Sequence, residues 1–315
     1  MAIESLERKR LWQVHQGQNK FFCDGRLVTS NSLSTLPVTI MLLIITLTFF
    51  YIFDVTYLCK KFSCSIAAIA SFLTAVCAIT LYLSAFADPG ILPRANSVEC
   101  EELNRFLSAS GIYVPKTGVT VAPPLTAIED GQMVLVKFCS TCRIYRPAKC
   151  SHCSVCDNCV DHFDHHCPWL GNCIGRRNYA SFFLFISSLS MLIVLVLTCE
   201  VVRIIDESDD YGKFVAQNPF STIVLFIVSV TSLPVVSLTA YHAYLVCVSA
   251  STCTDLKRLT DPNPLHTPVY LRLDLTWQRC WKNCVHVFCE PVPAGIDFRA
   301  YVVKEEEKAN VEVAS

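Results

Sequence analysis

Four long stretches of the chain lack charged residues and are rich in large apolar side chains. These stretches are 27–53, 62–87, 178–199 and 214–254. Each exceeds the roughly 20 residues that an α-helix needs to cross the hydrocarbon core of a bilayer. The alternative is that these stretches are buried helices of a large soluble protein. Such helices normally keep charged residues on one face, and the absence of charges argues against this alternative. The pattern predicts four transmembrane helices, and Pro219 and Pro234 are expected to bend the fourth.

The polar segments between these stretches predict the remaining elements. Residues 94–132 show no sustained periodicity and include three prolines, which is typical of a partly ordered linker. Residues 134–138 form a short apolar run that indicates a strand, and residues 277–288 suggest an amphipathic helix against the membrane. We identify no repeat of fixed period, and the charged tail from Lys304 is typical of disorder.

Lysine and arginine residues are distributed unevenly among the polar segments. The N-terminal segment carries five, the loop 88–177 nine and the C-terminal segment eight, whereas the two remaining loops share four. Cytosolic loops are enriched in these residues, so both termini and the central loop are predicted to be cytosolic. The first apolar stretch follows a polar segment and lacks a short apolar region with a small-residue cleavage site, so it indicates a membrane anchor and not a removable signal peptide.

The predicted fold is an all-α polytopic membrane protein with a cytosolic cysteine-rich domain between helices 2 and 3. The expected segments are a cytosolic N-terminal segment (1–32), transmembrane helices 1 and 2 (33–87), a cytosolic linker (88–132), the cysteine-rich domain (133–177), transmembrane helices 3 and 4 (178–250) and a cytosolic C-terminal segment (251–315). The mean hydropathy of +0.42 agrees with this fold. The lipid bilayer is the expected partner, and no basic patch with interleaved aromatic residues indicates nucleic acid.

The central loop contains a dense cluster of cysteine and histidine residues. Positions 139–173 hold eight of the nineteen cysteines and four of the eight histidines. Because the cytosol keeps thiols reduced, the cluster predicts metal binding or catalysis and not disulfides. The twelve candidates are Cys139, Cys142, Cys150, Cys153, Cys156, Cys159, Cys167, Cys173, His152, His162, His165 and His166. Two tetrahedral sites would use eight of them, and a remaining cysteine beside a histidine would be a nucleophile with its base.

The spacing leaves two kinds of metal open. Between positions 150 and 159 a cysteine occurs at every third residue, which is similar to the iron–sulfur pattern of bacterial ferredoxins except in its last interval. His152 within this run and the histidines after it favour zinc, which accepts imidazole and thiolate ligands equally well.

Four motifs define the cluster: Cys139-x2-Cys142, His152-Cys153-x2-Cys156-x2-Cys159, Asp164-His165-His166-Cys167-Pro168-Trp169 and Asn172-Cys173. Together with the four spans and the turn Asp88-Pro89-Gly90, they resemble the DHHC protein S-acyltransferases. Flanks such as Gly175-Arg176-Arg177-Asn178-Tyr179 resemble most the Golgi and endoplasmic-reticulum subgroup that acylates Ras-type GTPases. The resemblance implies a multi-pass palmitoyltransferase of these membranes, with the plasma membrane as alternative. It also implies membrane-associated substrates with cytosolic cysteines, among them Ras-type GTPases, and a small accessory subunit.

The resemblance also implies a ligand scheme with two structural zinc ions. One zinc would be bound by Cys139, Cys142, His152 and Cys159, the other by Cys153, Cys156, His166 and Cys173. Closed sites with three cysteines and one histidine have no open position for a substrate, so neither zinc would activate water. Cys150, His162, His165 and Cys167 remain, and Cys150 is expected to be a packed spare thiol.

The same resemblance implies that Cys167 attacks a fatty acyl-CoA, with His165 as base and Asp164 orienting the imidazole. Burial of a C16 chain at about 0.8 kcal/mol per methylene amounts to roughly 11–12 kcal/mol, which favours a cleft between the spans. Trp169 is expected to cover the thioester end of that cleft. The candidates for binding the phosphates of palmitoyl-CoA are Arg146, Lys149, Arg176 and Arg177.

Some features leave other interpretations open. Where the family usually has Thr-Thr-x-Glu, this chain reads Ser251-Thr252-Cys253-Thr254, which gives some support to a zinc-stabilised adaptor without catalysis. A membrane iron–sulfur redox protein is the other alternative. His242, deep in the fourth span, is expected to make an inter-helix hydrogen bond. Ordinary thiols, acylation sites or a metal cluster are the alternatives for Cys280, Cys284 and Cys289.

Overall fold

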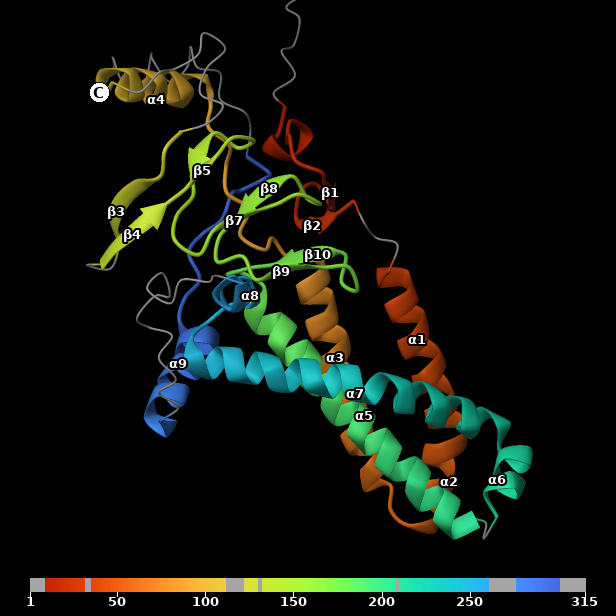
Figure 1. Ribbon diagram of the computed structural model, residues 1–315. Helices are drawn as coiled ribbons and strands as arrows, with labels where there is room; N and C mark the ends of the chain where they lie inside the picture. The colour runs from red at the N-terminus through yellow and green to blue at the C-terminus, as the bar shows by residue number, and fades with distance from the viewer. Residues whose placement is uncertain are drawn as a thin grey trace, which may run out of the picture.

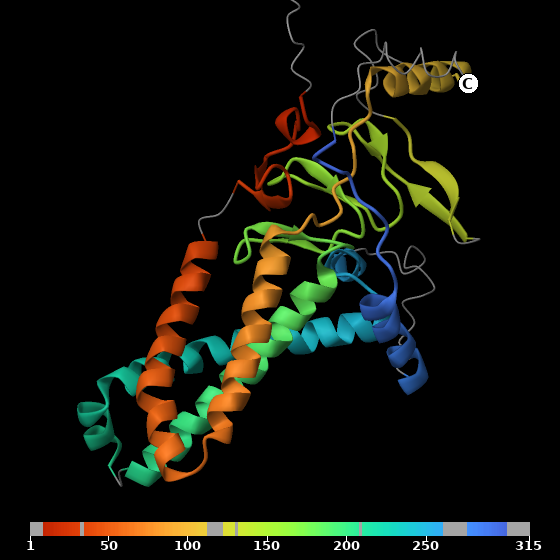
Figure 2. The ribbon, with the colours of Figure 1, turned by 180° about the vertical axis from the view of Figure 1, so that it is seen from behind.

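A layer of short β-hairpins lies at one end of a bundle of long helices (Figures 1 and 2). The computed structural model of the chain describes residues 9–31, 35–111, 122–129, 132–207, 210–260 and 276–300. The bundle contains α1 (Leu36–Phe49), the π-helical segment η2 (Phe50–Val55), α2 (Thr56–Lys61), α3 (Ser65–Phe86), α5 (Tyr179–Glu207), α6 (Tyr211–Gln217) and α7 (Pro219–Val248).

Four helices of the described chain are long and apolar enough to cross a membrane, which confirms the predicted spans. The first of them runs continuously from α1 through η2 into α2, beyond the charge-free stretch. The prediction that Pro219 bends the last span is wrong, because Pro219 is the first residue of α7, where its missing N–H is no loss. Pro234 lies inside α7, where it interrupts the hydrogen-bond ladder.

The hairpin layer contains five antiparallel pairs of strands in the described residues. They are β1 (Asn19–Phe22) with β2 (Leu27–Ser30), β3 (Leu125–Glu129) with β4 (Gln132–Val136), β5 (Phe138–Cys139) with β6 (Ile144–Tyr145), β7 (Ser151–Cys153) with β8 (Asn158–Val160), and β9 (His165–Cys167) with β10 (Asn172–Ile174). The strand expected at 134–138 is covered by β4 and β5, and the cysteine cluster forms short hairpins as expected.

The remaining helices are η1 (Leu11–Gln13), α4 (Ser97–Ala109), α8 (Thr252–Thr260) and α9 (Trp277–Cys289). Helix α9 covers the segment predicted as an amphipathic helix, whereas α4 lies in the predicted linker. Its signal was a capping box, in which Asn96 accepts from the backbone of Glu99 at 2.8 Å and Glu99 accepts from the backbone of Asn96 at 2.9 Å.

Two buried asparagines attach the hairpin layer to the end of α3. The amide of Asn172 donates to the carbonyls of Ala85 and Ala87 at 3.2 and 2.9 Å, and that of Asn178 donates to Ser84 at 3.1 Å. The last carbonyls of a helix have no partner within the helix, so these side chains satisfy groups that would otherwise be orphaned. Hairpin β9–β10 is thereby fixed against the end of a transmembrane helix.

At the opposite end of the bundle, Arg203 connects three helical segments. Its guanidinium forms an ion pair with Asp54 of η2 and donates to Ser221 of α7 at 2.7 Å. It also bonds Asn218 at 2.7 Å and pairs with Glu207 at 3.2 Å. Asp54 is fully buried and Arg203 is nearly so. Such a pair is costly to break, because the remaining partner keeps its buried charge.

We expect Arg203→Met to lower the thermal unfolding midpoint of the detergent-purified protein. The loss of a buried partner typically costs about 3–5 kcal/mol, since Asp54 would be left without a counter-charge. Lys213→Met is the matched control, because Lys213 is an exposed cation in α6 at the same end of the bundle. Equal unfolding midpoints for the two variants would contradict a stabilising role of the Arg203 network.

Candidate active site

Three consecutive hairpins of the cysteine-rich domain follow one plan with a period of 14 residues. The same register position is taken by three cross-strand pairs, Phe138 with Tyr145, His152 with Cys159, and His166 with Cys173. A turn residue with positive φ recurs at the same spacing: Arg143 (57°), Asp157 (52°) and Gly171 (62°). The expectation that the chain has no repeat of fixed period is therefore wrong. Only the middle hairpin retains every metal-binding residue of the plan, which obscures the repeat in the sequence.

The plan distributes the metal ligands between turns and strands. One group of ligand atoms consists of Cys139, Cys142, His152 and Cys159, and the other of Cys153, Cys156, His166 and Cys173. Each group combines two cysteines at the turn of one hairpin with the histidine–cysteine pair on the strands of the next. The structure thus gathers the eight expected residues in the two expected sets, and the two sets interleave.

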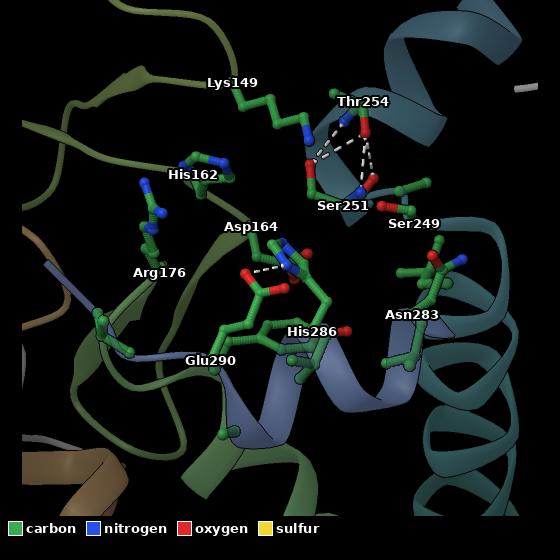
Figure 3. A pocket seen from close by; sticks show the side chains of 18 of the residues that line it. Lys149, His162, Asp164, Arg176, Ser249, Ser251, Thr254, Asn283, His286 and Glu290 are labelled. Carbon is green, nitrogen blue, oxygen red and sulfur yellow. Dashed lines mark hydrogen bonds and ion pairs between the residues drawn. The ribbon is translucent and has the colours of Figure 1, made fainter. Parts of the chain in front are cut away.

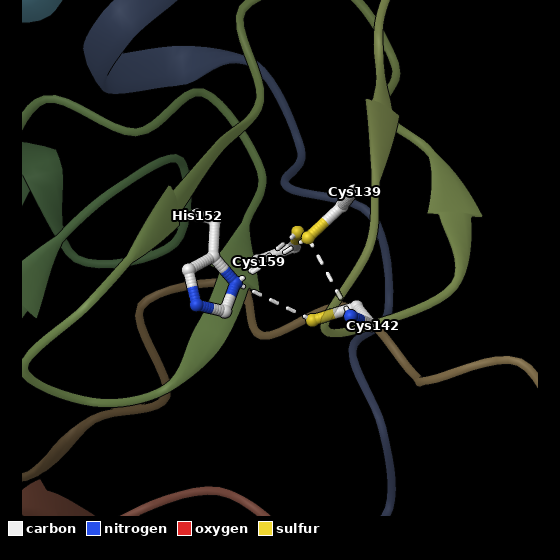
Figure 4. A group of neighbouring side chains, drawn as sticks. All are labelled: Cys139, Cys142, His152 and Cys159. Carbon is white, nitrogen blue, oxygen red and sulfur yellow. Dashed lines mark hydrogen bonds between the residues drawn. The ribbon is translucent and has the colours of Figure 1, made fainter. Parts of the chain in front are cut away.

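The geometry of the first group fits a tetrahedral zinc ion (Figure 4). Nδ1 of His152 lies 3.5 Å from the sulfurs of Cys139 and Cys142 and 3.8 Å from that of Cys159. Ordinary Zn–S and Zn–N bonds place sulfur and nitrogen ligands roughly 3.6 Å apart. On the other side of the ring, Nε2 of His152 lies 3.4 Å from the carboxylate of Asp157, and this contact fixes the orientation of the imidazole.

The second group fits zinc equally well. Nδ1 of His166 lies 3.5 Å from the sulfurs of Cys156 and Cys173, which are 3.4 Å from one another. Four ligand atoms in each group leave no open position, so zinc here would hold the hairpins together and would not bind substrate. Cys150 is buried against the first group but is not part of it.

The third hairpin departs from the plan at its turn. Cys167 and Leu170 occupy the two positions at which the preceding hairpins have paired cysteines. Cys167 belongs to neither metal group of the described residues. Side chains alternate along a strand, so His165 and Cys167 share one face of β9 while His166 points to the other. A thiol and an imidazole are thereby placed together, away from the metal ligands.

Asp164 and His165 form a charged pair beside this thiol. Nδ1 of His165 lies 2.7 Å from the carboxylate of Asp164, which is 2% exposed and also accepts the backbone N–H of Thr252 at 2.7 Å. Burial disfavours the charged form of Asp164, but the hydrogen bonds from His165 and Thr252 hold its pKa below the usual value. Burial likewise acts to lower the pKa of His165, yet Asp164 and Cys167 raise it to about 9. The imidazole therefore keeps a proton next to Cys167 at neutral pH.

Cys167 faces the apolar ends of the transmembrane helices. It is buried in one cluster with Leu36 of α1, Leu81 of α3 and Phe182 of α5. Trp169 lies at the turn of the same hairpin, where its carbonyl accepts from Thr39 of α1 at 3.0 Å and its side chain is 56% exposed. The nucleophile candidate thus lies at the boundary between the hairpin layer and the bundle.

The predicted cations differ in their placement. Lys149 and Arg176 line a pocket of about 140 Å³ together with His162 and Asp164, opposite α9 (Figure 3). Arg177 is engaged elsewhere, because it pairs with Asp88 at 3.3 Å and donates to the carbonyl of Pro293. Arg146 is not among the described residues that line this pocket. The structure therefore brings two of the four predicted cations together.

Several residues near the site were not predicted from the sequence. Thr252 contributes a backbone N–H to Asp164, which no side-chain pattern reveals. The altered motif after the fourth span places Asp255 where its carboxylate accepts from Tyr241 at 3.0 Å.

His242 makes the expected inter-helix hydrogen bond, with Nδ1 3.1 Å from the hydroxyl of Tyr179.

We expect Cys153→Ser to lose zinc and Cys150→Ser to keep it. Both thiols are buried in the cysteine-rich domain and both changes replace sulfur by oxygen, but only Cys153 belongs to a ligand set. Because metal binding and folding of such domains are coupled, Cys153→Ser should also express poorly. Elemental analysis of the purified variants tests this, with two zinc ions per chain expected for the unaltered protein. Equal zinc content in both variants would contradict the assignment.

Comparison with known proteins identifies the family. A family model described as DHHC palmitoyltransferase matches residues 134–258. Palmitoyltransferase ZDHHC14 of Homo sapiens is 36% identical over 95% of this chain, which spans 61% of that relative's length. ZDHHC9 of Homo sapiens is 35% identical over 98% of the chain and 85% of its own length. ZDHHC18-B of Danio rerio is 35% identical over 95% of the chain and 77% of its own length. The chain belongs to the family of DHHC palmitoyltransferases.

Proposed function

We propose that this chain is a protein-cysteine S-palmitoyltransferase in which Cys167 carries the acyl group. The observation that supports this best is the arrangement on β9, where Cys167 shares a strand face with His165. His165 is bonded to the buried carboxylate of Asp164, and Cys167 contacts the apolar cluster of the bundle. A nucleophile, a proton carrier and an orienting carboxylate in this order form the arrangement of a covalent acyl-transfer site.

The reaction proceeds in two thioester exchanges. The Cys167 thiolate attacks the carbonyl carbon of the acyl-CoA, the bond to the CoA sulfur breaks, and His165 delivers its proton to that sulfur. In the second exchange His165 acts as base and takes the proton of a substrate thiol. The substrate thiolate attacks the acyl-Cys167 thioester, and Cys167 leaves as the thiolate beside the protonated imidazole. One thioester is consumed and one is formed, so no nucleotide is required.

The acyl chain occupies the apolar surface next to Cys167. A groove of about 710 Å³ lies between β1–β2, α1 and α3 and is lined by apolar residues, among them Ile40 and Ile44. Leu36 and Phe86 line the groove and also pack in the cluster around Cys167. Each methylene buried there contributes about 0.8 kcal/mol, which favours long chains such as palmitoyl. Trp169, at the same boundary, covers the thioester end.

Cations of the hairpin layer bind the phosphates of CoA. Lys149 and Arg176 are the stronger candidates, since they already line one pocket beside Asp164. Arg146 and Arg177 are the weaker ones. Of these, Arg177 would have to exchange its contacts with Asp88 and Pro293 for phosphate. Arginine and lysine are both suited to phosphate, but only arginine can bind two of its oxygens in parallel.

Orientation and biological setting complete the proposal. The excess of Lys and Arg at both termini and in the central loop favours a cytosolic active site with access to acyl-CoA. The membrane is that of the Golgi or endoplasmic reticulum, with the plasma membrane as alternative. The substrates of the enzyme are membrane-associated proteins with cytosolic cysteines, such as Ras-type GTPases. A small accessory subunit assists the enzyme. The relatives' names support the palmitoyl transfer itself.

We expect Cys167→Ser to abolish labelling of the purified protein by a clickable palmitoyl-CoA. The label on the unaltered protein should be released by hydroxylamine, because it is held as a thioester. Cys150→Ser is the control, since it removes another buried thiol of the same domain that binds no metal. Zinc content should be unchanged in both variants. Labelling of Cys167→Ser at the level of the unaltered protein would exclude Cys167 as the acyl carrier, and absence of label from the unaltered protein would favour an adaptor.

Replacing His165 or His166, which are neighbours in β9, should cause different defects. His165→Ala retains the nucleophile and the metal, so we expect acyl-enzyme formation to slow by about 10²–10⁴-fold, the usual contribution of a proton-transferring group. Loading should recover partly at higher pH, where more of the thiol ionises unaided. His166→Ala should instead lose zinc without recovery at any pH, because His166 is a ligand. Loss of zinc from His165→Ala but not from His166→Ala would reverse these roles.

A further inference from the structure

Helix α7 places a second buried imidazole next to the Asp164–His165 pair. His242 is 1% exposed. Ligand atoms of Asp164, His165 and His242 all lie within 4.8 Å of one another, and the rings of His165 and His242 have their centroids 5.9 Å apart. The proposed reaction uses the first two residues only. His242 therefore lies against the site without an assigned role.

The ring of His242 is held in one orientation. Its Nδ1 lies 3.1 Å from the hydroxyl of Tyr179, at the start of α5. Phe182, one turn further along α5, contacts the rings of both histidines edge-on, with centroids 4.9 Å from His242 and 5.3 Å from His165. Tyr241 packs on the remaining side, with its own hydroxyl bonded to Asp255. An imidazole bound at Nδ1 has only Nε2 left for a further partner.

We propose that His242, oriented by Tyr179, is a positioning residue for the Asp164–His165 pair. With the tyrosine hydroxyl donating to Nδ1, Nε2 carries the hydrogen. Ligand atoms of His242 and Asp164 lie within 4.8 Å of one another, so this N–H is close enough to stabilise the charge of the carboxylate. That carboxylate receives His165 on one oxygen and the N–H of Thr252 on the other. These two close donors, from β9 and α8, fix its position, and the N–H of His242 from α7 adds a longer electrostatic contact that compensates its burial. The inference rests on the proposed acyl transfer, because positioning matters only if His165 moves a proton.

The charged and titratable groups around His242 agree with this role. Those of the described residues that lie next to it are Asp164, just before β9, His165 of β9, Tyr179 of α5, and Tyr241 beside it in α7. Only Asp164 carries a negative charge that a neutral imidazole N–H would stabilise. The arrangement therefore places an N–H near the carboxylate without adding a second charge.

The test compares single-turnover acylation of Cys167 by palmitoyl-CoA in detergent-purified variants. His242→Met fills the space but removes the donor, and the rate at saturating palmitoyl-CoA should fall by about 10- to 100-fold, the range typical of a lost hydrogen bond to a charged group. KM and zinc content should stay unchanged. His242→Gln retains an N–H near Nε2 and should recover most of the rate.

Tyr179→Phe removes one hydroxyl and should slow acylation in the same direction. Combined with His242→Met it should cause no additional loss, because the hydroxyl of Tyr179 acts only through the imidazole of His242. If His242→Met does not fold, Tyr179→Phe alone carries the test, and an unchanged rate would then overturn the proposal. A double variant whose loss of acylation rate equals the combined losses of the two single variants would also overturn the proposal.

Thr239→Val is the matched control, one turn before His242 in α7. The hydroxyl of Thr239 bonds Ser190 of α5 at 2.7 Å and the carbonyl of Ile186 at 3.0 Å, so its loss weakens the same helix pair without touching the site. The control should keep its acylation rate, and a loss equal to that of His242→Met would show that His242 only packs helices. If the unaltered protein formed no acyl-enzyme, the proposed function itself would fail. Normal acylation of His242→Met would overturn only the positioning role.

Discussion

The alternation of side chains along β9 is the constraint on which the site depends. His166 faces the sulfurs of a zinc group, and its neighbours His165 and Cys167 face the helices. The pairing of His166 with Cys173 sets the register of the hairpin, and both residues belong to one metal group. A slip of one residue would exchange the two faces and put the nucleophile in the metal site. Metal binding at this group would therefore fix the register and, through it, the face that holds His165 and Cys167.

That constraint is transmitted from hairpin to hairpin and into the bundle. The first zinc group joins the turn of β5–β6 to the strands of β7–β8, and the second joins the turn of β7–β8 to the strands of β9–β10. From β10, Asn172 donates to the last carbonyls of α3. Short hairpins are marginal by themselves in water. With both groups occupied by metal, these ions and one helix end would supply the rigidity that holds Cys167 in place.

Much of this organisation follows from the sequence. Charge-free stretches of this length indicate the four helices, because an α-helix satisfies all backbone hydrogen bonds of a segment within the bilayer. The cysteine and histidine motifs indicate two metal groups. Contacts between distant segments are not visible in this way. The N–H of Thr252 donates to the buried carboxylate of Asp164, 88 residues away in the chain. The amide of Asn172 donates to the carbonyl of Ala87, 85 residues away. Helix α4 has a local sequence signal in its capping box, and α7 has one in Pro219 at its first position. The prediction followed the composition of the surrounding residues and therefore missed both signals.

The 14-residue plan gives a physical reason for the position of the nucleophile. In the first two hairpins the turn cysteines can bind metal because a following hairpin supplies a histidine–cysteine pair. After β10 the chain enters α5, so no fourth pair reaches the turn of the third hairpin. There Leu170 replaces the second turn cysteine and is buried against the helices, which leaves Cys167 as a single thiol at a position shaped for a metal ligand. The group that faces this thiol is the Asp164–His165 pair in place of a metal ion. A backbone plan for binding zinc thus presents, in its last copy, a cysteine that is free to react.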